Sequence, residues 1–94
     1  MDQATQQVQL IEHRLNAAEA RWERLPQVEK EFSKWHPEDQ EVFVLEWSIE
    51  DDRLRRLEES FKHGAMTEEQ ATRYEELKQL AARNRPIIER LADR

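Results

Sequence analysis

Histidine and acidic side chains are the groups in this chain that could bind a metal ion. Glu59 and His63 lie four residues apart and therefore share one face of a helix, where they offer two ligands. A zinc or iron site needs at least three protein ligands, and none of the three histidines has the Glu-x-x-His spacing of di-iron bundles. Interaction of His63 with the dipole at a helix end is the favoured interpretation. No metal ion or other cofactor is predicted.

Catalytic motifs are also missing from the sequence. Ser33, Ser48 and Ser60 lack the flanking glycines of a nucleophile elbow, and a single glycine cannot form a phosphate-binding loop. The absence of cysteine excludes disulfides, thiol catalysis and thiolate metal sites. The acids in Glu50-Asp51-Asp52 are consecutive, so on a helix they point in different directions, and no calcium-loop motif contains them. We therefore expect a protein that is not an enzyme and has no small-molecule substrate.

Acidic residues are concentrated in the middle of the chain. Seven acids and no base lie between Glu38 and Asp52, and residues 36–63 carry a net charge of -5 out of a total of -6. This balance argues against nucleic acid as a direct partner, because phosphate binding needs a basic surface. One hypothesis is a docking surface for a basic partner protein. The structural alternative is charge compensation by the basic end of the last helix, which carries Lys78, Arg83, Arg85, Arg90 and Arg94.

Periodic apolar residues in the first segment, residues 1–35, predict a kinked, coiled-coil-like helix that packs on another helix. Its apolar positions alternate steps of three and four, as in a heptad repeat. If this helix pairs with a second copy of itself, flanking charges such as Arg14 and Glu19 favour parallel pairing. Pro26 is expected to kink or break the helix without changing its apolar face. The stripe, which we interpret as a homodimer surface, consists of Val8, Ile11, Leu15, Ala18, Trp22 and Leu25.

The middle segment, residues 37–63, is predicted to be a second helix that begins at Pro37. Residues 42–49 also alternate as a strand would, but in a helix Val42, Leu45 and Ile49 form one apolar line. Trp47 then falls off that line and becomes an anchor for a second chain, with core packing as an equally weighted alternative. The candidate partner-binding residues are Val42, Phe43, Val44, Trp47, Glu50 and Asp51.

The last segment, residues 67–92, is predicted to form an antiparallel hairpin with residues 37–63. Lys62-His63-Gly64 is typical of a helix end, and Thr67-Glu68-Glu69-Gln70 is a capping box that starts the next helix. Pro86 is expected to kink that helix or to start a short terminal one. Asn84, at an apolar position, either sets the register of a coiled coil or bonds a carbonyl freed at a kink.

Together these patterns predict an all-α fold: one domain, residues 1–94, built as an elongated bundle of three long helical segments and completed by homodimerisation. The predicted function is a non-enzymatic protein–protein interaction module, a homodimerising adaptor or regulatory protein that also binds another protein. The alternative is an acidic, antitoxin-like inhibitor that covers a basic site on a partner protein. A signal peptide is not predicted, and the longest apolar run, Val42–Leu45, is too short to cross a membrane. A cytoplasmic location without a membrane partner is expected.

Overall fold

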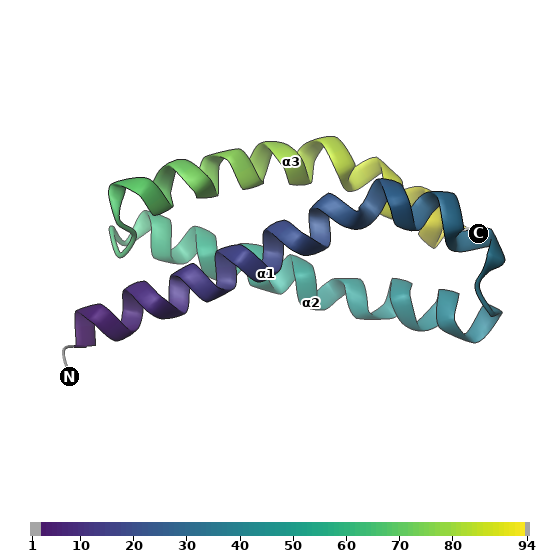
Figure 1. Ribbon diagram of the computed structural model, residues 1–94, viewed down its shortest axis with the longest axis horizontal. Coiled ribbons are helices and arrows are strands. Elements are labelled where there is room, and N and C mark those ends of the chain that lie inside the picture. The colour runs from purple at the N-terminus through teal and green to yellow at the C-terminus, as the bar shows by residue number, and fades with distance from the viewer. Residues whose placement is uncertain (1–2, 94) are drawn as a thin grey trace.

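The computed structural model describes residues 3–93, and nearly all of them are helical. Helix α1 spans Gln3–Glu31 and continues into a short 3-10 helix η1 at Phe32–Lys34; α2 spans Pro37–Lys62 and α3 spans Glu68–Ala92. The described residues contain no strand, so the all-α prediction is confirmed and residues 42–49 are helical. In Figure 1, α1 and α3 run from left to right and α2 runs back from right to left. Helices α1 and α3 are therefore parallel to each other, and α2 is antiparallel to both.

Local signals at the helix ends explain where the three long helices begin and end. The His36 side chain accepts a hydrogen bond from the Glu38 backbone N–H at 3.3 Å, and Pro37 occupies the first turn of α2. Gly64, just beyond α2, adopts a φ of 71°, a conformation that costs glycine little. The capping box at the start of α3 is confirmed, because Thr67 and Gln70 satisfy each other's backbone N–H groups.

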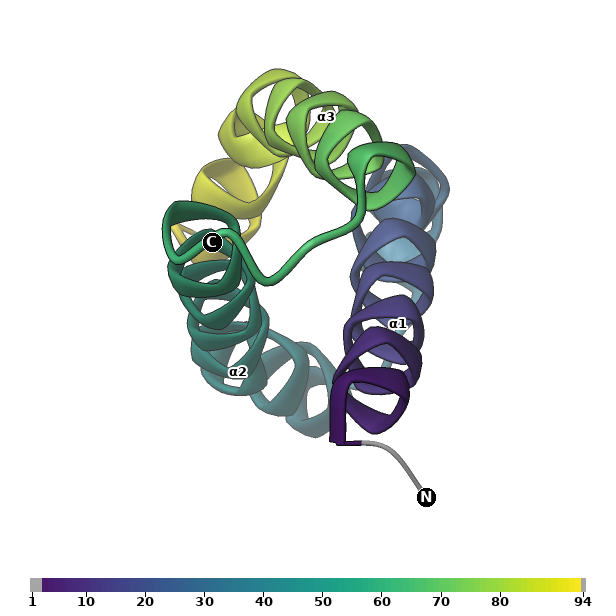
Figure 2. The ribbon, with the colours of Figure 1, turned by 90° about the vertical axis from the view of Figure 1, so that its left-hand side faces the viewer.

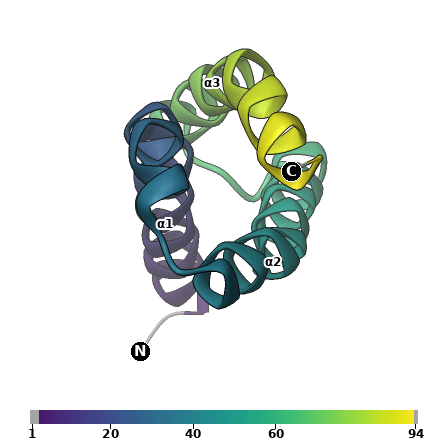
Figure 3. The same cartoon turned by 90° about the vertical axis from the view of Figure 1, so that its right-hand side faces the viewer.

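Both interior prolines lie within continuous helices. Pro26 leaves α1 unbroken to Glu31, and α3 continues past Pro86 to Ala92. In Figure 3 the carboxyl-terminal part of α3, drawn in yellow, turns down toward α2. Neither proline therefore divides its segment into two helices within residues 3–93.

The end views in Figures 2 and 3 show the three helices arranged around a common axis, and the buried side chains between them form the core. Trp22 lies where they meet. Its ring packs edge-to-face on Trp47 of α2, with 5.0 Å between centroids, and the guanidinium of Arg85 of α3 lies 5.2 Å from the ring centroid. Between α2 and α3, the rings of Phe61 and Tyr74 pack with 5.2 Å between centroids, and burial helps to raise the pKa of the Tyr74 hydroxyl to about 12.

The apolar stripe of α1 is covered mainly by the other helices of the same chain. Five of its six residues are buried and Val8 is half-buried. The most extensive packing among the described residues is between α1 and α3, which run parallel within one chain. Parallel self-pairing of α1 in a homodimer, which the flanking charges favoured, stays a prediction. The five buried residues are Ile11, Leu15, Ala18, Trp22 and Leu25.

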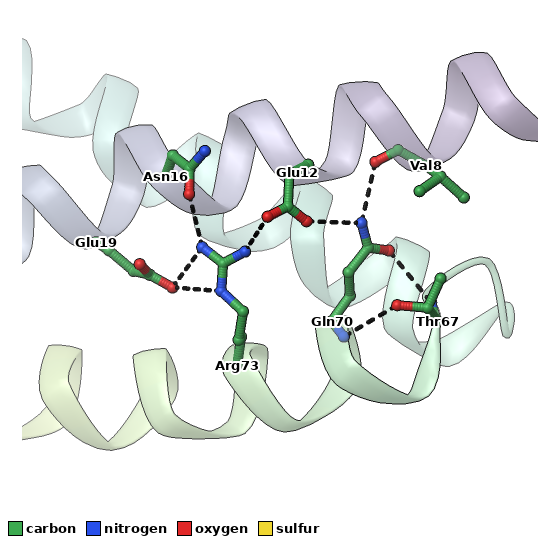
Figure 4. Close-up of polar contacts among 7 residues, drawn as sticks. All are labelled: Val8, Glu12, Asn16, Glu19, Thr67, Gln70 and Arg73. Atoms are coloured by element: carbon green, nitrogen blue, oxygen red, sulfur yellow. Dashed lines mark hydrogen bonds and ion pairs between the residues drawn. The ribbon is translucent and has the colours of Figure 1, made fainter.

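Polar side chains of α3 hold α1 in register, as Figure 4 shows. Arg73 donates to Glu19 at 3.1 and 3.2 Å and to Asn16 at 2.7 Å, and it forms an ion pair with Glu12. Gln70, which is buried, donates to the backbone carbonyl of Val8 in α1 at 3.0 Å and to the Glu12 carboxylate at 3.1 Å. The hydrogen bond from Gln70, together with the charge of Arg73, lowers the pKa of the Glu12 carboxyl.

Candidate protein-interaction surface

The structure spreads the six candidate partner-binding residues over both faces of α2. Val42 is 49% exposed, Asp51 is exposed, and Phe43 and Val44 are half-buried. Trp47 and Glu50 are buried. Of the two roles that the sequence left open for Trp47, the structure places it in core packing.

The exposed apolar surface of α2 is a line of three aliphatic residues, which we call the α2 ridge. Val42, Leu45 and Ile49 are 49%, 68% and 51% exposed, and their spacing of three and four residues puts them on one face of the helix. In the sequence this line defined the helix, and Val42, but not Leu45 or Ile49, was a candidate partner-binding residue. In the structure the opposite line of α2 packs inward, so all three residues of the ridge are exposed.

The line of α2 that faces inward contains a charged residue, which makes this line difficult to recognise in the sequence. Steps of four and three run without interruption through six positions, but the third of them is Glu50. Five of the six are aromatic or aliphatic, and the phase of Leu57, which is fully buried, identifies the line. The full line is Phe43, Trp47, Glu50, Leu54, Leu57 and Phe61.

Glu50 lies between α2 and α1 with its side chain 7% exposed. One carboxylate oxygen is 2.8 Å from Arg53 and 3.8 Å from Arg21, whereas the other, Oε2, has no hydrogen-bond partner among residues 3–93. Burial raises the pKa of this carboxyl, against the opposing effect of Arg53 and Arg21. A small cavity of about 80 Å³ adjoins it on the α1 side of the ridge.

A larger groove flanks the ridge on the side of α3. It has a volume of about 410 Å³ and runs between the start of α2 and the end of α3, with Phe32, Val44, Leu45 and Leu91 in its lining. Leu45 therefore belongs both to the ridge and to the wall of the groove. The apolar surface offered by α2 is continuous with this groove.

Four acids around the amino-terminal half of α2 have no ion-pair partner in the described part of the chain. Within residues 3–93 no ion pair involves Glu38, Asp39, Glu41 or Glu46. Glu38 and Asp39 lie in the first turn of α2, where the helix dipole favours acids. All four are exposed, so they leave a negative surface beside the ridge.

Basic residues of α3 turn mainly to α1 rather than to the acidic helix. Arg90 donates to Glu29 of α1 at 2.8 and 3.0 Å, whereas the Arg85–Asp51 pair, at 2.9 Å, is the one ion pair between α3 and α2 in the described part of the chain. Arg94, which the sequence also suggested as a counter-charge, lies outside the described residues. Compensation of the acidic helix by α3 is therefore limited to Asp51.

Within residues 3–93 no group of three or more histidine, aspartate and glutamate side chains is arranged to hold a metal ion. The helices of this part of the chain are all too short or too polar to cross a membrane. No protein-family model, curated protein or solved structure matches this chain. Its function is therefore inferred from the surface described above.

Proposed function

We propose that this chain is a non-enzymatic protein-interaction module whose contact surface is the α2 ridge with its acidic surroundings. The observation that carries the proposal is the exposure of Val42, Leu45 and Ile49 on one face, at 49%, 68% and 51%. Single exposed aliphatic residues are common on protein surfaces, but a continuous patch bordered by charges is typical of an interaction site. Anchors spaced as these three are suit packing against another helix.

The proposal is tested with two matched substitutions of exposed leucines. Leu45→Glu places a charge in the middle of the ridge, while Leu10→Glu makes the same change on α1 at a residue that is 46% exposed. We expect Leu45→Glu to abolish binding of a partner protein, a second copy of this chain included, because the carboxylate would be buried on docking without a counter-charge. Leu10→Glu is expected to preserve that binding.

Quantitative binding measurements in cell extract and with purified chain provide the readout, with the circular dichroism melt of each variant as a check of folding. The proposal fails when no protein, this chain included, binds in a manner that depends on Leu45.

The second candidate function, an acidic inhibitor that covers a basic site, is favoured by the four acids without ion pairs. It differs from the first in its response to salt, because contacts between exposed charges are screened within about 8 Å at physiological ionic strength. Release of a bound partner between low and moderate salt supports the inhibitor, while retention supports the apolar ridge. In either function the protein is proposed to act in the cytoplasm.

A further inference from the structure

Resting on the proposed function, we infer that the α2 ridge binds the α2 ridge of a second copy, with the two helices antiparallel about a two-fold axis near residue 47. Two of the three ridge residues, Leu45 and Ile49, lie two residues to either side of that position. In such a pair Leu45 of one copy lies against Ile49 of the other. The ridge then meets a copy of itself, as the symmetry of a two-fold dimer requires.

Charges at the two ends of the ridge have opposite signs. Glu38 and Arg56 are 18 residues apart, which is five helical turns, so both extend the line of the ridge. The amino-terminal end carries exposed acids that form no ion pair with another of residues 3–93. The carboxyl-terminal end carries Arg53, Arg55 and Arg56, with side chains 39%, 70% and 59% exposed.

The arginines at the carboxyl-terminal end are paired within their own helix and remain accessible. Arg55 and Arg56 contact Asp52 three and four residues away, and Arg53 contacts Glu50. The exposed pairs of Arg55 and Arg56 with Asp52 contribute about 0.3–0.5 kcal/mol each, so they restrict these two arginines little. Arg55 and Arg56 can each meet a second acid from a neighbouring chain.

Antiparallel packing brings the unlike ends together, whereas parallel packing brings like ends together. Glu38 of one copy approaches Arg56 of the second copy, and the same contact repeats at the other end by symmetry. A basic helix from a different protein would match the acidic end but would place its cations against the three arginines. Charge complementarity over the full length of the ridge therefore favours a second copy as the occupant.

Charge reversal at each end tests the pairing in sedimentation equilibrium. Glu38→Arg with Asp39→Arg makes both ends positive, and Arg55→Glu with Arg56→Glu makes both ends negative. Each double variant is expected to raise the dimer dissociation constant at least roughly tenfold, because like charges then face each other. An equimolar mixture of the two variants is expected to recover the dimer, since each then meets its opposite.

Single cysteines report the orientation, because the chain contains no cysteine of its own. Under mild oxidation a mixture of Glu38→Cys and Arg56→Cys is expected to form a disulfide-linked heterodimer, while either variant by itself remains largely monomeric on a non-reducing gel. Cross-linking of Glu38→Cys with itself would overturn the antiparallel arrangement.

A monomer at all concentrations would overturn the dimer. In that case binding of a different protein that Leu45→Glu abolishes would leave the proposed function intact, with that protein as the occupant. The absence of any such binding would remove the proposed function as well.

Discussion

The carbonyl oxygen of Trp22 loses its helical hydrogen-bond donor, because Pro26, four residues later, has no N–H. Asn84 of α3 supplies the donor instead, at 2.8 Å from its side-chain amide. Asn84 was notable in the sequence as a polar residue at an apolar position, and Pro26 as a proline inside a helix. The proline explains why a polar side chain is needed at position 84, and the hydrogen bond from Asn84 explains how the proline is tolerated. Together they fix where α3 crosses α1.

This pairing predicts a coupling between two distant substitutions. Asn84→Ala leaves the Trp22 carbonyl without a donor and is expected to cost about 1–3 kcal/mol of unfolding free energy. In a Pro26→Ala background the same change is expected to cost less, because the alanine N–H restores the helical bond. Urea unfolding of the four chains in this double-mutant cycle measures the coupling. Strict additivity would contradict the pairing.

Glu50 is a second polar residue at a position where an apolar residue is expected. Burial raises the pKa of its carboxyl above the ordinary value of 4.5. At Glu50 the folded state therefore binds more protons than the unfolded state at pH values between 4.5 and the raised folded pKa, and the stability that Glu50 contributes below pH 4.5 is lost as the pH rises through its folded pKa.

The isosteric variant Glu50→Gln removes this proton linkage. We expect its unfolding free energy, relative to that of the wild type, to increase as the pH is raised from below 4.5 to neutrality. Denaturant titrations at several pH values measure the difference, with Glu46→Gln as the control for loss of one exposed charge from the same helix. A difference that decreases with pH would show that ion pairing with Arg53 outweighs burial.

At the scale of the helices, one side chain both begins α3 and joins it to α1. Gln70 takes part in the capping box, as the sequence predicted, and also donates to the Val8 carbonyl and to Glu12. The capping box is a local pattern of four residues and was visible in the sequence. The contacts to α1 connect residues 58 and 62 positions apart and were not.

Two substitutions in the capping box separate its local role from its tertiary role. Thr67→Ala removes a helix cap and is expected to cost about 1 kcal/mol. Gln70→Ala removes the reciprocal bond and also a buried connection between helices, so a larger cost, about 2–4 kcal/mol, is expected. Thermal or urea unfolding gives both values. Equal costs would mean that the contacts of Gln70 to α1 contribute no stability.

In α2, apolar periodicity predicts a helix but does not identify the face that is buried. Two apolar lines run along it, and the shorter one, Val42, Leu45 and Ile49, contains no charged residue. The longer line is interrupted by Glu50, so a reading by hydrophobicity favoured the shorter one. The protein buries the longer line because it carries Trp47 and Leu57, which together cover more apolar area.

For the whole molecule, the choice of which apolar line of α2 is buried determines which substitutions unfold the chain. Trp47→Ala opens a cavity against Trp22 in a domain of 94 residues and is expected to cost about 3–5 kcal/mol. Leu45→Ala, two residues away on the ridge, is expected to stay within about 0.5 kcal/mol, because its side chain is 68% exposed. Chemical unfolding of the monomer at low concentration compares the two. Similar costs would refute the assignment of faces.

The sequence by itself determined the start and the end of α2, the start of α3 and the turn at Gly64. Caps, glycine at positive φ and apolar spacing act over a few residues and can be recognised without knowledge of the fold. The sequence left open whether residues 42–49 are helical and whether Pro26 and Pro86 divide their segments, and its apolar stripe predicted that α1 packs on another helix.

Only the tertiary structure decided that this helix is α3 of the same chain, which line of α2 faces inward, and that Asn84 replaces the donor missing at Pro26. Those outcomes depend on contacts between residues far apart in the chain, from 25 positions for Trp22 and Trp47 to 62 positions for Trp22 and Asn84. Such contacts depend on how all three helices pack together, so they cannot be predicted from patterns among neighbouring residues.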